Sequence, residues 1–566
     1  MDILFPLKQF REQFRKAFQT LAVELFERLT QSTGVDVSGN RATVVELRKK
    51  EREIARLQGW LRFFTALLVL LFVGVGVGIG AAFQQNLGRL ARVLSVCGVV
   101  AGMLLFVWLF RCRRRRKQMK AQKEREAATL LATAEAQMAA LNAAYTWDIA
   151  PRLIEQLLPF FHFEPQVSAA LQARIVGNYE VEDPFAGVEE AIHFVQGGTC
   201  FGNPFLYGRM RRQRWVDHVY TGTKVITWTD WVYSKGRRRS VTRVGVVTAS
   251  LTKPKPDYVA STFLFFAHEA APQLVFSHEP SELSKADDGF FARRKRAREL
   301  KRLEHKARNL KDESQYTLMG NRDFELLFHA TDRTDEVAFR YLFTPAAQQE
   351  MLAILKDRET GYGDDFTFRK QGCANLIMAQ HLGEAQLSTD PDRFADICYD
   401  DAKATFIAFQ NDYFRHFYCA FLPLLAIPAY RQAPSTAFAE APETPAGLAT
   451  WELESLAYAY DEKLLAPQHA ATPLILKVQD LGVLEGVRQV MVTAHAFCAI
   501  KCMEEVLALG PDGKKHLVPV QWIDYRPIEK TSRLFIAEGE PSEDFRERML
   551  DYPHLTRRGL ATYLVS

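Results

Sequence analysis

The densest pattern able to do chemistry is a block of basic residues at positions 293–311. It holds ten Lys or Arg residues against two Glu residues. On a helix such a block can grip phosphates of nucleic acid or of lipid headgroups, and it is also typical of a solvated helix face. No nucleic-acid-binding fold accompanies it, which disfavours nucleic acid. We therefore expect an anionic partner at Arg293, Arg294, Lys295, Arg296, Arg298, Lys301 and Arg302.

One grouping has a spacing that a metal site could use. His495, Cys498 and Cys502 follow the i, i+3, i+7 spacing of one helix face and could hold a metal if a fourth ligand came from elsewhere. An ordinary buried segment explains these three residues better. The eight cysteines are scattered without a C-x-x-C pair, so we expect neither a zinc ribbon nor a disulfide framework. The sequence predicts no metal and no cofactor.

Nucleophilic chemistry has only weak candidates. His193, Cys200 and His218, the last beside Asp217, could form a Cys–His pair, but nothing in the sequence fixes their proximity. The adjacent carboxylates Asp364 and Asp365, like Asp400 and Asp401, point apart on any regular element, which argues against a shared site. No P-loop, H-E-x-x-H or G-x-S-x-G motif is present. We therefore favour a binding protein over an enzyme and name no catalytic residue.

Two apolar runs come before all these residues. Residues 60–83 and 93–110 are nearly free of charge, and about 20 apolar residues suffice to cross a bilayer core. A loop of about nine residues separates them, so the sequence predicts a transmembrane helical hairpin. Within it, the G-x-x-x-G spacing suits close helix packing in the hairpin or a homo-oligomer, although small residues of no special role remain the alternative. The glycines concerned are Gly74, Gly78, Gly98 and Gly102.

Basic residues on both sides of the hairpin predict its orientation. Five Lys or Arg residues precede the first run, whereas the loop offers only Arg89 and Arg92. Lys and Arg are retained on the cytoplasmic side, so both termini are expected in the cytoplasm. The cluster after the second run should contact anionic lipid headgroups. Its members are Arg113, Arg114, Arg115, Arg116 and Lys117.

The chain of 566 residues is long enough for several units. Amphipathic helices are expected at 1–59, with an apolar stripe from Leu7 to Leu29 that either lies in the membrane interface or packs on a partner or core helix. A basic juxtamembrane stalk, with a short coiled-coil stripe, is expected at 112–149. The remainder reads as a cytoplasmic α+β domain at 150–430, a Pro/Ala-rich linker at 431–449 and a smaller α/β unit at 450–566.

Within the α+β domain, hairpins of β-strands are expected in two places. Residues 224–233 and 241–251 are rich in β-branched and aromatic residues and flank a basic turn, SKGRRRS. Residues 323–329 and 337–343 flank the polar turn ATDRTDE, and a helix should start at Pro345.

The stretch NRDFELLFHATDRTDEVAFRYLFTPAAQQEML, residues 321–352, resembles a group of uncharacterised bacterial membrane proteins. These have two helices near the N-terminus and a cytoplasmic domain of unknown function. The resemblance covers about 30 residues and the overall layout, and it implies a multi-pass protein of the bacterial inner membrane without assigning an activity. Our interpretation is a membrane-anchored binding or scaffold protein with an unknown protein partner. A membrane-bound enzyme and a transport or channel accessory subunit are the alternatives.

Overall fold

The computed structural model of the chain describes residues 5–82, 89–181, 185, 187–234, 237–285, 289–309, 316–439, 447–539 and 541–565. Four expected features lie at least partly outside them: the loop between the two apolar runs with Phe83, the basic turn at 235–236, Lys311, and the linker at 431–449. The surroundings of Gly78 and Gly98 are not described either. The chain is of mixed α and β structure and forms two compact units. One comprises Met1–Phe18, Asp148–Thr389 and Asn411–Ser566; the other comprises Gln19–Trp147 and Asp390–Gln410.

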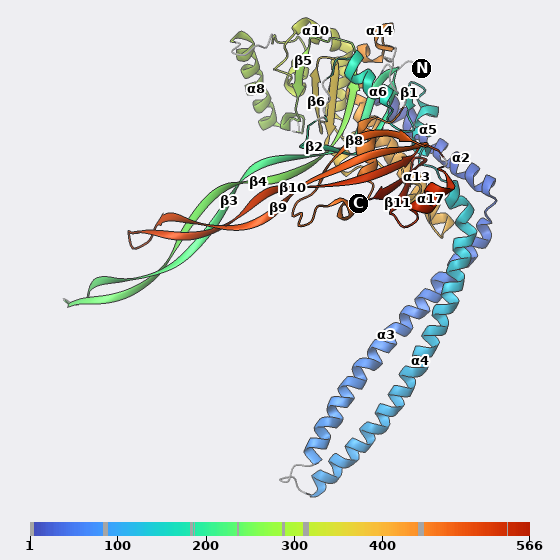
Figure 1. The fold of residues 1–566 in the computed structure, drawn as a ribbon, viewed down its shortest axis with the longest axis vertical. Helices are drawn as coiled ribbons and strands as arrows, with labels where there is room; N and C mark the ends of the chain where they lie inside the picture. The colour runs from blue at the N-terminus through green and yellow to red at the C-terminus, as the bar shows by residue number, and fades with distance from the viewer. Residues whose placement is uncertain are drawn as a thin grey trace. The chain divides into compact units, whose positions relative to one another are not determined.

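The smaller unit is built on two long helices, α3 (Val37–Ala82) and α4 (Arg89–Ala144) (Figure 1). They lie side by side in opposite directions, because Lys50 pairs with Glu126 at 2.5 Å while Arg116 stacks 4.6 Å from the Trp60 ring. The segment Val37–Val77 is long and apolar enough to cross a membrane, with a mean hydropathy of 2.2 over its best window. It is the one such helix found among the described residues.

A short apolar stripe packs the part of α4 that the sequence predicts as a stalk. Ala134, Met138 and Leu141 of α4 are fully buried, as the heptad pattern predicts. Nearby, the buried Asn40 side chain donates to the carbonyl oxygen of Ile397 at 3.0 Å. The short helical turn Pro391–Phe394 and the first residues of α13 (Tyr399–Leu425) complete this unit.

The larger unit includes the N-terminal segment, which comprises α1 (Pro6–Gln9), a π-helical turn at Phe10–Phe14 and the start of α2 (Arg15–Thr33). Phe10 and Phe18 are completely buried. Phe10 stacks on Tyr418 at 4.9 Å between ring centroids, and Phe18 stacks on Phe414 at 4.2 Å. The apolar stripe of this segment therefore packs on α13, which decides against a position in the membrane interface.

The larger unit contains two antiparallel sheets. The first has seven strands in the order β1-β2-β3-β4-β7-β6-β5, and the second has five in the order β11-β12-β10-β9-β8. The first sheet comprises β1 (Phe161–Phe163), β2 (Glu190–Cys200), β3 (Asn203–Ser234), β4 (Arg237–Ala267), β5 (Val275–His278), β6 (Phe366–Gln371) and β7 (Ala374–Ala379). The second comprises β8 (Ile475–Leu484), β9 (Val487–Leu509), β10 (Lys515–Ala537), β11 (His554–Arg557) and β12 (Leu560–Val565).

One short helix, α15 (Thr450–Ala457), joins the cores of the two sheets. Trp451 belongs to the apolar cluster of the first sheet, whereas Leu453 and Leu456 belong to that of the second. The buried Glu452 of the same helix pairs with Arg558 at 3.3 Å. The remaining helices of this unit are α5 (Ile149–Leu157), α6 (Ala169–Ala173), α7 (Glu282–Lys285), α8 (Phe290–Arg308), α9 (Arg322–Phe328), α10 (Glu336–Leu342), α11 (Pro345–Lys356), α12 (Gln380–Glu384), α14 (Thr436–Ala439), α16 (Glu462–Leu465) and α17 (Glu543–Met549).

The hairpin expected at 323–329 and 337–343 is wrong, because both segments are helices, α9 and α10. Each helix has a side-chain cap that overrides the strand propensity of its aromatic residues. Asn321 accepts a hydrogen bond from the backbone N–H of Phe324, and Asp335 accepts one from that of Ala338. The helix expected to start at Pro345 is α11, capped in the same way by Thr344.

The strands expected at 224–233 and 241–251 are confirmed, but they are parts of much longer elements. β3 has 32 residues and β4 has 31. Beyond Arg212, where β2 stops pairing with β3, they continue as a two-stranded ribbon that we call the first arm, residues 213–258. At roughly 3.3 Å per residue it reaches roughly 70 Å. Beyond His495, where β8 stops pairing with β9, β9 and β10 form a shorter ribbon, the second arm, residues 496–528 (Figure 1).

The two arms pack face to face. Ile226 and Val247 of the first arm form a buried cluster with Val518 and Val520 of the second. The backbones approach so closely at Gly222 that a Cβ there would lie 2.2 Å from the carbonyl oxygen of Pro519. A two-stranded ribbon is marginally stable alone in water, so this contact holds both arms extended.

We predict that Gly222→Val separates the arms locally, because the new side chain collides with the Pro519 backbone. Overpacking of this kind costs about 1–3 kcal/mol. Hydrogen exchange of the β3 amides between 216 and 228 should accelerate at least five-fold. Thr221→Val is the matched control, since Thr221 is exposed on the outer face and keeps a branched side chain. Equal exchange in both variants would contradict the prediction.

Candidate functional site

The basic block lies on α8, a helix of 19 residues. Its basic side chains divide between two faces. Most of the expected anionic-partner residues are exposed: Arg293, Arg294, Lys295, Arg298, Lys301 and Arg302, with Arg296 partly buried. Two exposed phenylalanines, Phe290 and Phe291, stand at the start of the helix with 74% and 83% of their surface accessible.

The opposite face of α8 is fixed to the domain. Leu303 is buried in a small apolar cluster with Tyr316 and Leu326. Lys306 donates from Nζ to the hydroxyl of Thr331 at 3.2 Å. The helix is therefore a docked element that presents a basic face, rather than a solvated helix projecting from the domain.

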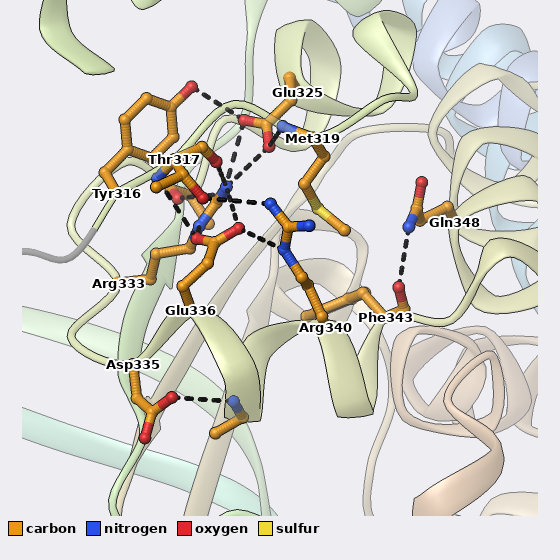
Figure 2. A network of polar contacts seen from close by, with 12 residues as sticks. Tyr316, Thr317, Met319, Glu325, Arg333, Asp335, Glu336, Arg340, Phe343 and Gln348 are labelled. Carbon is orange, nitrogen blue, oxygen red and sulfur yellow. Dashed lines mark hydrogen bonds and ion pairs between the residues drawn. The ribbon is translucent and has the colours of Figure 1, made fainter. Parts of the chain in front are cut away.

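Behind α8 lies a buried network centred on Arg333, which is 1% exposed (Figure 2). Its guanidinium donates to Oε1 of Glu325 at 2.7 Å and to Oε2 of Glu336 at 2.7 Å. The Tyr316 hydroxyl donates to the other oxygen of Glu325 at 2.9 Å. Arg333 also lies over the rings of Tyr316 and Phe339, at 4.5 and 4.3 Å. This network ties the segment after α8 to α9 and α10.

The charges in this network are set by their neighbours. Burial opposes ionisation of Glu336, but the hydrogen bond and charge of Arg333 outweigh it and lower the pKa of that carboxyl. Burial likewise opposes the charge of Arg333, and Glu325 more than offsets it, so the pKa of the guanidinium is raised. Both groups stay charged near neutral pH, and each acceptor of the network is used inside the protein. The arrangement positions neighbouring elements and leaves no group free for proton transfer.

A groove of about 470 Å³ opens next to the network. Arg340 stands at its wall, where Nε donates to Glu336 at 2.8 Å and the guanidinium reaches Thr317 at 3.1 Å. Gln348 closes another side by donating to the Phe343 carbonyl oxygen at 2.8 Å (Figure 2). The lining carries one cation and several amides, so it suits a polar or anionic group. It is formed by Met319, Gly320, Asn321, Arg340, Phe343, Pro345, Gln348 and Gln349.

Two aspartate–histidine pairs form elsewhere in the same unit, from the adjacent Asp364 and Asp365. Asp364 pairs with His278 at 2.9 Å, and both side chains are fully buried. Asp365 pairs with His381 at 2.6 Å. The two carboxylates thus point apart, as expected for sequence neighbours. The space beside Asp365 is about 10 Å³, which leaves no room for a substrate.

The structure does not bring the expected Cys–His residues together. His193 and Cys200 lie on one strand, β2, seven positions apart, or roughly 23 Å. His193 stacks on Tyr458, and Cys200 is 2% exposed. Burial raises the pKa of the Cys200 thiol, the opposite of what a nucleophile needs. His218 lies on the first arm opposite Lys253.

The expected metal ligands His495, Cys498 and Cys502 are not on a helix but on strand β9. On a strand, His495 faces the side opposite to the two cysteines. His495 instead contacts Glu529 at 3.1 Å. Among the described residues, no group of three or more His, Cys, Asp or Glu side chains could hold a metal ion.

The basic residues expected at the membrane surface lie on α4. Arg116 stacks over Trp60 and Phe64 of α3, and Arg113 donates from Nε to Thr65 at 3.1 Å. A surface hollow of about 380 Å³ lies beside them, lined by Phe110, Arg113, Arg114, Lys117, Gln118 and Ala121. Of the expected packing glycines, a Cβ at Gly102 would lie 2.8 Å from the Val75 side chain of α3, whereas a Cβ at Gly74 would meet no described atom of another element within 4 Å.

Sequence reasoning missed the Arg333 network. A signal was present, because Arg333, Glu336 and Arg340 have the i, i+3, i+7 spacing of one helix face, next to a good N-cap at Asp335. The interpretation of this segment as a hairpin hid that spacing. The partner Glu325 lies one helix earlier, and only the tertiary structure brings it into contact.

We predict that Glu325→Gln destabilises the larger unit by about 3 kcal/mol, because it leaves the buried Arg333 charge without its closest partner. Thermal unfolding of the detergent-solubilised full chain measures the effect. Arg340→Ala removes a half-exposed ion pair of the same network and should cost less than about 1 kcal/mol. Similar losses in the two variants would show that Arg333 does not depend on Glu325.

A second prediction concerns acid stability. Burial, aided by Arg211 and Arg209, lowers the pKa of His193 to about 3 from its ordinary 6.5. A histidine whose folded pKa is lowered contributes stability that is complete above about pH 6.5 and is lost as the pH falls toward 3. His193→Phe keeps the ring on Tyr458 and removes the titration. The melting temperature should therefore fall less between pH 7 and pH 4.5 in this variant than in the parent.

The exposed His162 supplies the control, since His162→Phe should leave that pH dependence unchanged. A parental slope in His193→Phe would contradict the assignment.

Comparison with known proteins found no relative of this chain. No family model matches the chain, and neither a curated protein nor a solved structure matches it. The resemblance at 321–352 thus stays an expectation based on the sequence.

Proposed function

We propose that this chain is a membrane-anchored binding protein held in the bacterial inner membrane by α3 and α4, with both termini in the cytoplasm. The carrying observation is the apolar part of α3, whose best window has a mean hydropathy of 2.2 and is only 11% buried. Apolar surface of that extent is stable in lipid and not in water. Phe72 and Val77 of α3 and Leu104 of α4 are among its most exposed side chains, at 72%, 68% and 69%.

The flanks of the two helices support the orientation. Arg113, Arg114, Arg115, Arg116 and Lys117 follow the second apolar run directly, where retained cations mark the cytoplasmic side. Trp60 and Trp108 are 48% and 59% exposed at the same end, a position typical of interfacial aromatics.

The binding role is proposed for the face of α8 and the adjoining groove. The exposed cations of α8 complement an anionic partner, and the Arg333 network gives that helix a rigid base. The adjoining groove adds amide groups and the Arg340 guanidinium, which is paired with Glu336. Asp364 and His278 are fully buried, and the space beside Asp365 is about 10 Å³, so neither pair faces a cavity of the described residues that could hold a substrate, which favours binding over catalysis.

The anchor is tested by alkaline carbonate extraction of membranes that contain the full chain. We expect the parent to stay in the pellet and Leu70→Arg with Phe72→Arg to lose at least half of its membrane fraction, because two charges then face lipid. The control pair Ala132→Arg and Ala136→Arg lies on an exposed part of α4 outside the apolar run and should behave like the parent.

Release of the parent by carbonate would refute the anchor. The orientation is tested by fusing to the C-terminus a reporter enzyme that is active only outside the cytoplasm. Activity of this fusion would refute the cytoplasmic C-terminus.

A further inference from the structure

The first arm extends farther than the second arm that supports it. At Gly245 a Cβ would lie 2.7 Å from Pro511, so the turn of the second arm reaches the level of Gly245 and Trp228. Beyond this level the first arm continues alone. We call this end the arm tip; its described residues are 229–234 and 237–243.

One face of the arm tip is aromatic. The register pairs Trp231 with Ser240 and Tyr233 with Arg238, so these four side chains share the outer face. Trp231 is 55% exposed and Tyr233 is 76% exposed.

The same outer face continues down the first arm as an uncharged stripe of branched residues. Val225 pairs with Val246, and Thr227 pairs with Val244. The three valines are more than half exposed, at 67%, 57% and 67% for Val225, Val246 and Val244. An exposed apolar stripe that ends in Trp and Tyr marks an interaction surface rather than an ordinary solvated ribbon.

The other feature of the arm tip is its charge. Asp230, its one described acidic residue, pairs with Arg243 at 3.2 Å. Arg237, Arg238 and Arg239 make no ion pair within the described part of the chain. The arm tip therefore offers three unneutralised guanidinium groups beside two exposed aromatic rings.

We propose that the arm tip docks on the surface of an anionic phospholipid bilayer. Trp231 and Tyr233 enter the headgroup region, and Arg237, Arg238 and Arg239 contact lipid phosphates. Amphipathic rings favour this boundary, and each cation near an anionic surface adds attraction. The inference rests on the proposed function, since a chain anchored in a membrane meets such surfaces at high local concentration.

Nucleic acid fits the arm tip less well. Binding of single strands relies on open aromatic faces on which bases stack. The guanidinium of Arg238 already lies over the Trp231 ring at 4.7 Å, so one face of that ring is occupied. At a membrane interface the stacked pair can keep its geometry. The Trp231 ring then lies among the glycerol groups of the lipids, and the Arg238 guanidinium contacts a lipid phosphate.

The test uses the full chain in nanodiscs of phosphatidylcholine, so that its anchor is satisfied, and measures co-sedimentation with sucrose-loaded vesicles. The vesicles contain phosphatidylcholine alone or a 70:30 mixture with phosphatidylglycerol. We expect the parent to bind the mixed vesicles at least ten-fold better than the neutral ones. Combined Arg237→Glu, Arg238→Glu and Arg239→Glu should abolish that preference, and Trp231→Ser with Tyr233→Ser should weaken binding at least five-fold.

Two further variants locate the effect. Lys501→Glu with Lys515→Glu alters exposed charge on the second arm and should bind like the parent. Combined Arg298→Glu, Lys301→Glu and Arg302→Glu alters α8, the other exposed basic surface, and measures its separate share of the binding to anionic vesicles. Loss of binding in the α8 variant with full binding in the arm-tip variant would overturn the proposal.

The proposal is also overturned if the parent shows no preference for anionic vesicles. It equally fails if the arm-tip variants lose binding to a fluorescent 20-nucleotide polyuridylate while keeping their binding to vesicles. Failure of the chain to enter nanodiscs would instead refute the anchor, so the two failures are distinguishable.

Discussion

The packing of two β-ribbons against each other is the contact on which the proposed outer surfaces depend. A lone two-stranded ribbon exposes both faces to water and is marginal in stability. Here the first arm buries Ile226 and Val247 against Val518 and Val520, and each fully buried side chain of this kind contributes about 1.5–3 kcal/mol. Because Gly222 lets the backbones meet at Pro519, the inner faces close without a gap. The uncovered outer face of the first arm is consequently supported up to the level of Gly245, beyond which the arm tip begins.

A second constraint holds the basic helix α8. A buried arginine is tolerated only when its charge is paired, and Arg333 is paired with Glu325 and Glu336. The Tyr316 hydroxyl donates a hydrogen bond to the second carboxylate oxygen of Glu325. Since Tyr316 also packs against Leu303 of α8, the network links the charge pairing to the position of that helix. A buried ion pair adds little net stability, but an arrangement that separates the partners leaves a buried charge uncompensated and is strongly destabilised. The network therefore favours the observed position of α8 over alternatives in which these charges are apart.

Inside the larger unit, the paired side chains of Asp364 and His278 have no access to solvent. Exposed aromatic and basic groups instead gather on outer surfaces: the apolar stretch of α3, the face of α8 and the arm tip. These are the surfaces to which we assign the proposed contacts with lipid or with a partner.

Local signals in the sequence sufficed for the mixed α+β class, the long apolar helix, the start of α11 at Pro345 and the paired strands around the basic turn. They failed where local propensity and capping conflict, as at Asn321 and Asp335, whose caps turned two expected strands into helices. Of the candidate sites, the basic block was visible in the sequence as charge. Three features were decided only by the tertiary structure. They are the pairing of Arg333 with Glu325, the burial of the histidines, and the packing of the two arms against each other. Each joins residues that are distant in the chain or lie on separate elements, and no local pattern records which of them will meet.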